Sequence, residues 1–324
     1  MKLSHIFTNS IKPGYIFEIP DQPINFMLDL TNSCNNRCLY CYNPGNQNYR
    51  NDYPDPASLK EIVSLIGETG TKEILYLGGE PFALQEVQEI LETGKKYEIF
   101  QRAVSNGSFF KNVKRCIELK ESGLNEIGIS FHSSNEAIND KIAGRKGAYQ
   151  DALLGLENCA SAGITTFVQY SPNSLNSTHD ILLLAQLIKE RLDDEVRFFD
   201  INRLLPIEQG RSAKHIFLEE DEWFHFLVTA TTLQYNGFEV RSELTPFCWL
   251  QYQAKTHDIS EEILNRIFKM NRGCYMWVAQ LALDYKGRIK FCPAGPAVGP
   301  SILDVNWPDF WTEWIQFEKY RSFL

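Results

Sequence analysis

Short apolar runs alternate with longer amphipathic segments along the first two thirds of the chain. The runs predict strands, and the segments, in which apolar residues recur every three or four positions, predict helices. The predicted strands are Ile24–Leu30, Glu73–Leu77, Ile99–Val104, Glu126–Phe131, Thr165–Tyr170 and Val196–Ile201. The predicted helices are Ser58–Glu68, Leu84–Lys95, Phe110–Ser122, Tyr149–Ala162 and Asp180–Leu192.

This alternation, with a period of roughly thirty residues, is typical of βαβ units and a parallel sheet. A closed eight-stranded barrel would need more chain, so we expect an α/β fold with an open, partial (β/α)6 barrel. Parallel α/β folds place their sites at the carboxyl ends of the strands. The polar and glycine-rich loops of this region each follow a strand, and we therefore expect them to share one rim.

The pattern changes after Gly210-Arg211, where a small α+β region is predicted. Gln280–Phe291 alternates around Lys286-Gly287 and predicts a β-hairpin. The other predicted elements are the helices Leu218–Tyr235 and Glu261–Met270, the strand Phe238–Glu243 and an aromatic-rich docking helix in Trp307–Leu324. The predicted organisation is a lead-in over residues 1–23, the barrel over 24–211 and the α+β domain over 212–324.

Charge, apolar runs and cysteine content limit which partners and which cellular compartment are expected. Lys+Arg total 32 and Asp+Glu total 41, a net charge of −9, which argues against nucleic acid because phosphate binding needs clustered basic residues. No apolar run is long enough to span a bilayer, and Met1–Ser10 lacks the apolar core of a secretory signal. We therefore expect a cytoplasmic protein without a membrane partner. Its eight cysteines then indicate thiols or metal ligands, not disulfides.

Three of these cysteines follow the first predicted strand, in the pattern Cys34-x3-Cys38-x2-Cys41. Thiolates so close together are usually ligands of a soft metal centre. A structural zinc site normally has four ligands, and no fourth cysteine or histidine lies nearby in the sequence. Three thiolates on an iron–sulfur cube, with one iron left open, fit the spacing best.

The cysteine pattern, with Tyr40 just before its last cysteine, resembles the signature of radical S-adenosylmethionine (radical SAM) enzymes. Gly78-Gly79-Glu80-Pro81, which ends the second predicted strand, resembles the GGEP motif of the same family. The resemblance implies a [4Fe–4S] cluster whose open iron binds the amino and carboxylate groups of S-adenosylmethionine. Reduction of the cluster by a flavodoxin- or ferredoxin-type donor would cleave the cofactor to methionine and a 5′-deoxyadenosyl radical, which abstracts a substrate hydrogen.

The resemblance assigns roles residue by residue. Cys34, Cys38 and Cys41 would hold the cluster. Gly78, Gly79 and Glu80 would contact the methionine amino group through backbone carbonyls, and Arg145 would contact the carboxylate. Tyr40 would lie near the adenine, and Ser105 and Asn106 on the ribose side. Ser130 is a further expected cofactor contact. The alternatives are ordinary polarity at turns and strand ends for the serines and Asn106, and a solvated surface charge for Arg145.

Other polar residues end predicted strands on the same rim. His132 follows the fourth strand, where it could act as a catalytic acid–base group or be a hydrogen-bonded structural residue. Gln169, Tyr170 and Arg203 end the fifth and sixth strands, and we expect them to line the cavity.

A second cysteine set, Cys248, Cys274 and Cys292, lies in the C-terminal region. Cys274 and Cys292 flank the predicted hairpin and resemble the opening of a SPASM or twitch auxiliary-cluster domain, and Arg203–Arg211 resembles the linker of those proteins. The further cysteines of a full SPASM domain are missing, so at most one auxiliary [4Fe–4S] cluster could form. The alternatives are buried thiols or a hydrogen-atom donor, for which Cys248 is the best candidate; Cys116 and Cys159 are predicted to be core residues.

Three functions are compatible with these motifs. The first is modification of a ribosomally made peptide by cross-linking, thioether formation or epimerisation. About twenty residues precede the first predicted strand, so peptide recognition would fall to the barrel or to a separate leader-peptide recognition protein. The second is the same chemistry on a small metabolite, as in the cyclase of molybdenum-cofactor biosynthesis. The third is a non-catalytic iron–sulfur protein for electron transfer or sensing, in which the GGEP motif would have no role.

Overall fold

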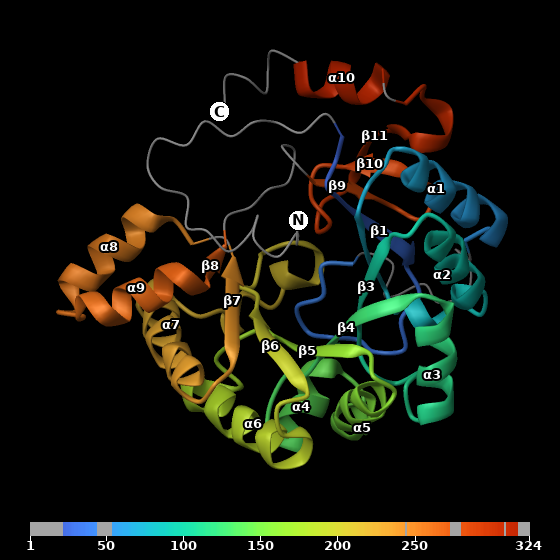
Figure 1. Ribbon diagram of the computed structural model, residues 1–324. Helices are drawn as coiled ribbons and strands as arrows, with labels where there is room; N and C mark the ends of the chain where they lie inside the picture. The colour runs from blue at the N-terminus through green and yellow to red at the C-terminus, as the bar shows by residue number, and fades with distance from the viewer. Residues whose placement is uncertain (1–21, 44–53, 244, 273–279, 308, 317–324) are drawn as a thin grey trace.

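A computed structural model describes residues 22–43, 54–243, 245–272, 280–307 and 309–316 of the chain. Six parallel strands that are hydrogen-bonded in sequence order form the predicted partial barrel (Figure 1). They are β1 (Asn25–Thr31), β2 (Glu73–Gly78), β3 (Phe100–Ser105), β4 (Leu124–Ser130), β5 (Thr165–Tyr170) and β6 (Val196–Ile201). The α/β fold class predicted from the alternating pattern is thereby confirmed.

Helices follow these strands on the outer side of the barrel (Figure 1). They are α1 (Pro56–Glu68), α2 (Val87–Lys96), α3 (Val113–Ser122), α4 (Glu136–Ala143), α5 (Ala148–Ser161) and α6 (Ser177–Leu192). The sequence pattern missed α4, which is only 8 residues long. Asn135 caps its first turn by accepting a hydrogen bond from the Ile138 amide, and Gly144 ends it in the left-handed conformation.

The sheet continues beyond the barrel at both edges and has eleven strands within the described residues. The added strands are β7 (Glu239–Glu243), β8 (Asn271–Arg272), β9 (Gln280–Leu283), β10 (Arg288–Lys290) and β11 (Ala297–Ser301). β7 pairs in parallel with β6, and β9 pairs in parallel with β1. The predicted hairpin is confirmed as β9 and β10, which turn at Gly287 with φ +73°. Because these pairings cross residue 211, the division into two domains stays a prediction.

The remaining helices lie beside the added strands. They are α7 (Glu220–Tyr235), α8 (Phe247–Thr256), α9 (Glu261–Met270) and α10 (Asp309–Gln316). The sequence pattern predicted α7 and α9 but not α8. Of the expected terminal helix, residues 309–316 are helical and residues 317–324 lie outside the described part of the chain. Among the described helices, none combines the length and the apolar character needed to cross a membrane.

The hydrophobic core lies between the strands and the outer helices. Alternate strand residues such as Ile127 and Ile129 of β4 are fully buried there. Each such side chain contributes roughly 1.5–3 kcal/mol through its removal from water. Cys116 of α3 and Cys159 of α5 are also fully buried, with their sulfurs 3.9 Å apart, which confirms the prediction that they are core residues.

Charged side chains are paired at the amino ends of the barrel strands. Arg102 of β3 lies 2.8 Å from Glu73 of β2 and 2.6 Å from Glu126 of β4. Arg197 of β6 lies 2.8 Å from the other oxygen of Glu126. We call these four residues the base network. They tie four strands together at the end of the barrel opposite to the loops that carry the sequence motifs.

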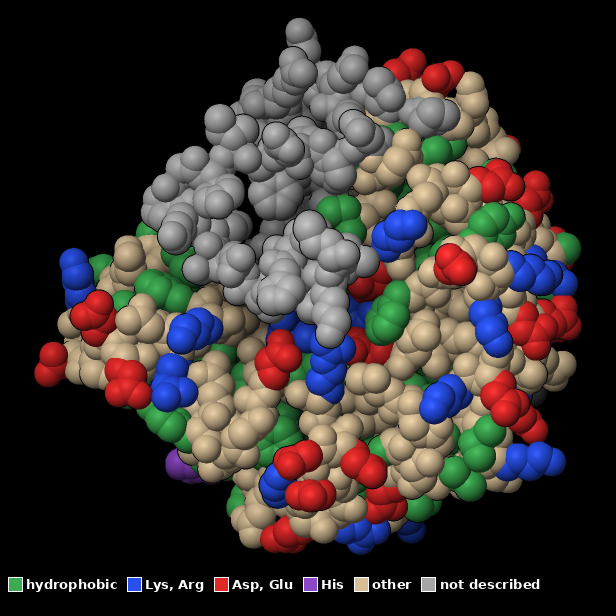
Figure 2. Space-filling model, in the orientation of Figure 1, with side chains coloured by type: hydrophobic (Ala, Val, Ile, Leu, Met, Phe, Trp, Pro, Cys, Tyr) green, Lys and Arg blue, Asp and Glu red, His purple; other side chains and the backbone are tan. Residues whose placement is uncertain are grey.

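Charge is distributed differently on the outer surface. Figure 2 shows acidic and basic side chains interspersed over the visible face, without a continuous basic area among the described residues drawn there. A nucleic-acid surface would require Lys and Arg gathered on one face.

Candidate functional site

The loop that carries the first three cysteines is fixed by the turn between α4 and α5. The amide of Arg37 donates to the Ala143 carbonyl at 2.9 Å, and the amide of Leu39 donates to the Ile142 carbonyl at 3.0 Å. Gly144 makes this approach possible, because a Cβ atom there would lie 2.3 Å from the Arg37 carbonyl oxygen. Its φ of +63° also favours glycine. The loop is therefore held by the backbone of a distant segment.

The three sulfurs lie in one electrostatic neighbourhood. Burial, together with the nearby charges of Glu80 and Cys41, raises the pKa of Cys34 to about 12. Burial also raises the pKa of Cys38, and the charges of Cys41 and Cys34 add to that effect. The thiols are thus close enough to oppose one another's ionisation, which a bound metal centre would relieve.

Hydrogen-bond donors point at two of these sulfurs. The Asn36 amide lies 3.4 Å from the Cys34 sulfur, and the Asn106 side-chain amide lies 3.7 Å from it. The Asn43 amide lies 3.4 Å from the Cys41 sulfur. N–H donors of this kind stabilise the negative charge of a thiolate, and in iron–sulfur proteins they tune the cluster.

The Gly78–Glu80 segment runs directly beside the start of the cysteine loop. The amide of Gly79 donates to the Thr31 carbonyl at 2.6 Å, and the amide of Glu80 donates to the Ser33 carbonyl at 2.7 Å. A Cβ atom at Gly79 would lie 2.1 Å from the Ser33 carbonyl oxygen. The second motif therefore needs glycine because two backbone segments meet there.

The Glu80 carboxylate joins the end of β2 to the end of β3. It accepts hydrogen bonds from the Ser105 hydroxyl and the Asn106 amide, both at 2.8 Å, and from the Phe82 amide at 3.2 Å. Burial raises its pKa to about 7, although these three donors and Arg145 favour the ionised form. The structure thus brings together Glu80, Ser105 and Asn106, as the sequence predicted for one rim.

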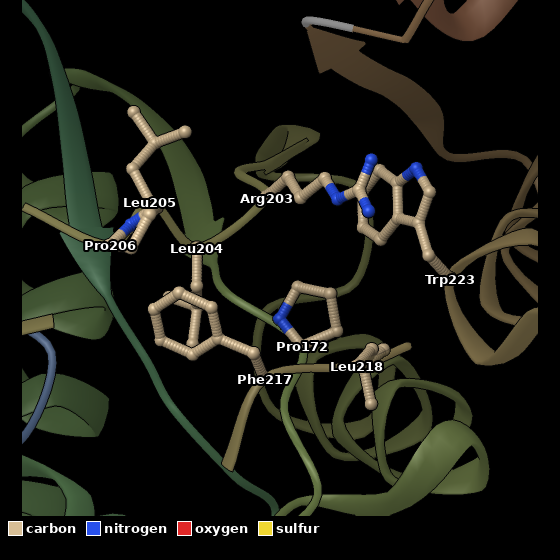
Figure 3. A pocket seen from close by; sticks show the side chains of 8 residues that line it. All are labelled: Pro172, Arg203, Leu204, Leu205, Pro206, Phe217, Leu218 and Trp223. Atoms are coloured by element: carbon tan, nitrogen blue, oxygen red, sulfur yellow. The ribbon is translucent and has the colours of Figure 1, made fainter. Parts of the chain in front are cut away.

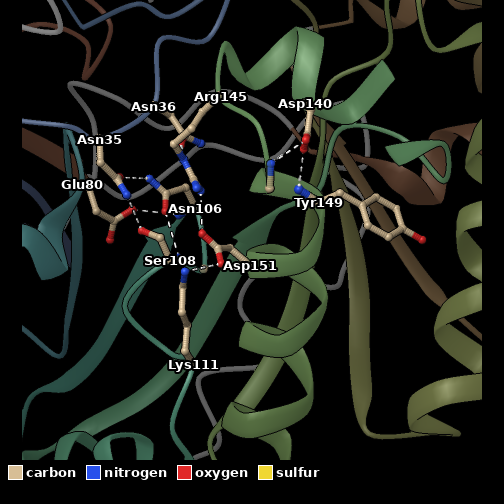
Figure 4. A network of polar contacts seen from close by, with 12 residues as sticks. Asn35, Asn36, Glu80, Asn106, Ser108, Lys111, Asp140, Arg145, Tyr149 and Asp151 are labelled. Atoms are coloured by element: carbon tan, nitrogen blue, oxygen red, sulfur yellow. Dashed lines mark hydrogen bonds and ion pairs between the residues drawn. The ribbon is translucent and has the colours of Figure 1, made fainter. Parts of the chain in front are cut away.

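Asparagine side chains extend this arrangement to the cysteine loop (Figure 4). The Asn106 side chain donates to Asn35 at 2.7 Å, and the Arg145 guanidinium donates to Asn36 at 2.5 Å. Arg145 is also paired with Asp151 of α5 at 2.8 Å, and Asp151 with Lys111 at 2.7 Å. We call the set that contacts the loop the rim network: Asn35, Asn36, Glu80, Asn106, Arg145 and Asp151.

Arg145 is therefore partly buried and ion-paired, not a solvated surface charge. Its predicted contact with a cofactor carboxylate stays a prediction. Asp151, which sequence reasoning did not select, holds this guanidinium beside the loop and is itself buried. Its acidic side chain in the first turn of the helix, next to the apolar run Ala152–Leu154, is the signal that could have identified it.

His132 is a buried, neutral residue between the cysteine loop and α4. Its Nδ1 lies 2.9 Å from the Tyr40 hydroxyl, and its Nε2 lies 4.0 Å from the Cys38 sulfur. Its backbone amide donates to Asn139, and its carbonyl accepts from Asn176. Burial lowers the pKa of His132 to about 4. These contacts support the structural alternative, while a catalytic role stays a prediction.

The other strand-end residues have different environments. Ser130 ends β4 and is in register with Gln169 of β5, and both side chains are partly buried. The Gln169 Oε1 atom is buried and has no hydrogen-bond partner among the described residues. Tyr170 does not line a cavity as expected: it is fully buried, donates to Asp180 at 3.0 Å and stacks on Phe226 of α7. Alternation along β5 turns it toward the helices.

The second cysteine set is spread over the molecule. Cys248 is exposed in the first turn of α8, and Cys292 is partly buried just after β10, which lies in another part of the molecule (Figure 1). Cys274 lies outside the described residues. Within the described residues, no three His, Cys, Asp or Glu side chains are arranged to hold a single metal ion. The predicted auxiliary ligands, and the donor role of Cys248, stay predictions.

Two asparagines of the cysteine loop were also missed. Asn35 and Asn36 connect the loop to Asn106 and Arg145, but sequence reasoning treated them as spacers between cysteines. Their position between ligand-type residues was the available signal, because amide side chains there can bridge the loop to its surroundings.

Comparison with known families matches the motif-bearing region. Residues 28–172 match the family model described as the Radical SAM superfamily. The matched region begins in β1 and ends just after β5, so it includes the cysteine loop and the whole rim network.

Three similar proteins illustrate the range of relatives. Fe-coproporphyrin III synthase of Methanosarcina barkeri is 27% identical over 208 residues, which are 61% of this chain and 51% of that protein. PqqA peptide cyclase of Gluconobacter oxydans is 25% identical over 146 residues, 45% of this chain and 40% of that protein. The chain thus spans about half of the length of these curated relatives or less.

The fold is shared with a solved structure, Streptococcus suis SuiB bound to the precursor peptide SuiA. The TM-score is 0.69 at 15% identity, and the match covers 90% of this chain and 65% of that chain.

Proposed function

We propose that this chain, whose residues 28–172 match the radical SAM superfamily model, is a radical SAM enzyme that reductively cleaves S-adenosylmethionine and uses the resulting radical to modify a ribosomally made peptide. The observation that carries the proposal is the junction between the cysteine loop and the Gly78–Glu80 segment. Glu80 and Asn106 link that segment to the loop that presents Cys34, Cys38 and Cys41. Such a junction would place a cluster-bound ligand against both motifs.

The residues present fit a [4Fe–4S] cluster. Three thiols share one loop and oppose one another's ionisation, and the sulfurs of Cys34 and Cys41 receive N–H donors. A cube places each thiolate on a different iron, so the described residues need not form the tighter set that a single ion requires. When bound, the cluster and S-adenosylmethionine supply a 5′-deoxyadenosyl radical that abstracts a hydrogen atom from the substrate.

The chain's own residues position and shield this chemistry. Gly79 and Glu80 use their amide hydrogens to bind the cysteine loop, so a ligand amino group would meet the backbone carbonyls of this segment. Asn106 donates to the Cys34 sulfur, and Asp151 orients the Arg145 guanidinium toward the loop. Tyr40 and His132 cover one side of the loop with a part-buried hydrogen bond.

A peptide substrate is supported by the fold and by one relative. SuiB, which shares the fold, was solved with a precursor peptide, and PqqA peptide cyclase is a sequence relative. A flavodoxin- or ferredoxin-type protein would supply the electron. A separate leader-peptide recognition protein is a further proposed partner.

A small-metabolite substrate is the second candidate. It is favoured by the similarity to Fe-coproporphyrin III synthase, which extends over 61% of this chain. The rim network would serve the same role in either case, because its contacts are with the cysteine loop.

An auxiliary [4Fe–4S] cluster near Cys292 is part of the proposal. Cys292 directly follows the confirmed hairpin, and its charge reaches Tyr42 next to the first cysteine set. Anaerobic reconstitution should give about eight irons per chain, and Cys292→Ala about four with cleavage of S-adenosylmethionine retained. About four irons in the wild type would contradict the auxiliary cluster.

The proposed function is tested by anaerobic turnover with dithionite and S-adenosylmethionine. We expect 5′-deoxyadenosine from the wild type, and a rise well above that background when a small peptide encoded beside the gene is added. Stimulation by a tetrapyrrole or nucleotide instead would favour the metabolite. An absence of 5′-deoxyadenosine in every arm, with the cluster present, would overturn the proposed chemistry and restore the electron-transfer hypothesis.

A further inference from the structure

A cavity beside the carboxyl ends of β5 and β6 is separate from the cysteine loop. Its volume is about 300 Å³. The residues that line it come from the segment after β5, the segment after β6 and the start of α7: Pro172, Arg203, Leu204, Leu205, Pro206, Phe217, Leu218 and Trp223 (Figure 3). We propose that this cavity is a substrate subsite that binds an apolar side chain and the neighbouring carboxylate of a peptide, with Arg203 as the carboxylate partner.

The apolar part of the subsite is formed by prolines, leucines and aromatic rings. Figure 3 shows Leu204 beside Phe217, with Pro172 and Leu218 next to them. Leu205 and Pro206 are exposed at the opening, so apolar surface continues from the cavity to the outside. A peptide side chain bound here would be removed from water while the rest of its chain extended along the rim.

Arg203 supplies the positive charge. Its guanidinium lies 5.5 Å from the centre of the Trp223 ring, and the Trp223 Nε1–H donates to Thr245 at 3.2 Å. The indole is thereby fixed as a platform for the guanidinium. Within the described residues, no carboxylate lies at ion-pair distance from Arg203, although acidic residues outnumber basic ones in the chain by 41 to 32.

The apolar lining and the Arg203 guanidinium together indicate which chemical class of ligand the cavity would bind. An arginine that lies over an aromatic face, with no acidic partner in the described part of the chain, is suited to an incoming carboxylate. The cavity is near the lower limit of the roughly 300–1,000 Å³ typical of small-molecule sites. It therefore fits part of a ligand, such as one residue of a peptide and its neighbour, and not a complete nucleotide or tetrapyrrole.

The subsite is connected to the proposed catalytic centre. Pro172 directly follows Ser171, which hydrogen-bonds with Tyr40 of the cysteine loop, and the Ser171 carbonyl accepts from Asn176 at 3.1 Å. A peptide anchored in the cavity would pass close to the loop. The inference rests on the proposed function for its peptide, but binding can be measured without any turnover.

The test compares two capped dipeptides that differ in charge alone. Ligand-observed NMR titration of the full, reconstituted chain would measure the Kd of acetyl-Leu-Asp-amide, acetyl-Leu-Asn-amide and 4-methylpentanoate, without S-adenosylmethionine. We expect the Asp dipeptide to bind about tenfold more tightly than the Asn dipeptide, since the contact is a charge-assisted hydrogen bond. Arg203→Gln should remove that difference, and Arg203→Lys should retain part of it.

Arg211→Gln is the matched control, because Arg211 is exposed in the same segment and does not line the cavity. It should bind both dipeptides as the wild type does. Equal binding of the two dipeptides to the wild type, or an unchanged preference in Arg203→Gln, would overturn the assignment. Binding of 4-methylpentanoate as tight as that of the Asp dipeptide would replace the peptide by a small carboxylic acid. Because none of these binding measurements requires turnover, their outcome does not depend on whether the chain produces 5′-deoxyadenosine.

Discussion

The two ends of the barrel hold polar networks of different composition. The base network pairs full charges with one another, and its central residue, Glu126, has a side chain only 2% exposed. The rim network combines three amide side chains with the Glu80 carboxylate and the Arg145–Asp151 ion pair, and it ends at the cysteine loop, where Asn106 donates to a sulfur. The charges of the base network are paired with one another, whereas the rim network contacts a loop with three thiols that could bind a metal centre.

This difference indicates a division of roles. Substitutions in the base network should change the free energy of unfolding and leave iron binding intact. Substitutions at the rim should change iron binding and cleavage of S-adenosylmethionine more than stability. A variant that behaves in the opposite way would break the comparison.

The largest effect is expected from Cys38→Ala. Removal of one of three thiolates should abolish stable cluster binding and 5′-deoxyadenosine formation, because the resemblance leaves no spare cysteine in the loop. Iron analysis and product chromatography measure both. Cys116→Ala removes a buried thiol away from the loop and should retain iron. Full iron content in Cys38→Ala would refute its role as a ligand.

Glu126→Gln tests the base network. Its carboxylate faces two arginines, at 2.6 and 2.8 Å, so neutralising it should lower the free energy of unfolding by about 3–5 kcal/mol. Urea denaturation of the iron-free chain measures this. Glu61→Gln, at an exposed position of α1, should change stability by no more than about 0.5 kcal/mol. Loss of iron from folded Glu126→Gln would show that the two ends are not independent.

Gly144→Ala tests the backbone support of the cysteine loop. The new Cβ atom would meet the Arg37 carbonyl, displace the loop and weaken iron binding by about 10- to 100-fold, as do other changes next to metal ligands. Gly147→Ala is the matched control, since Gly147 also has a positive φ, +81°, but has open space around its Cα. Competition with an iron chelator measures both, and equal effects would assign the loss to backbone strain.

Glu80→Gln tests the buried carboxylate through pH. The pKa of Glu80 is raised from 4.5 to about 7, so the folded chain binds this proton more tightly than the unfolded chain. The stabilisation that protonated Glu80 gives to the folded chain is therefore fully present below the unfolded pKa and is lost as pH rises from about 4.5 to about 7. Over that range the free energy of unfolding should fall by at most about 1.4 kcal/mol per pH unit. Denaturation of the iron-free chain should show this slope in the wild type and not in Glu80→Gln; parallel pH profiles would contradict it.

The alternating pattern was sufficient to predict the barrel because strands buried on both faces are continuous apolar runs. Thr165–Tyr170 and Val196–Ile201 were predicted with the bounds that the structure shows. Short elements were missed: α4 depends on its Asn135 cap and Gly144, and β8 and β11 depend on pairing with neighbouring strands. Sequence also could not show that the hairpin would pair with β1 at the edge of the barrel sheet.

The candidate site was predictable where its residues share a motif. Cys34, Cys38 and Cys41 lie in one loop, and Gly79 and Glu80 in another. Asp151 and Asn36 were not selected, and their contacts with Arg145 could not be read from the sequence, because these contacts depend on how α5 is placed against the loop. The stacking of Tyr170 on Phe226 likewise depends on the position of α7, although alternation along β5 already turns the Tyr170 side chain toward the helices.

The central claim is that the cysteine loop holds a cluster to which S-adenosylmethionine binds. Its most direct test is electron paramagnetic resonance of the dithionite-reduced triple variant Cys248→Ala, Cys274→Ala, Cys292→Ala, with and without S-adenosylmethionine. The account predicts the signal of one reduced [4Fe–4S] cluster, which changes when the cofactor is added. A variant that is folded but carries no cluster, or a cluster signal that S-adenosylmethionine leaves unaltered, would contradict it.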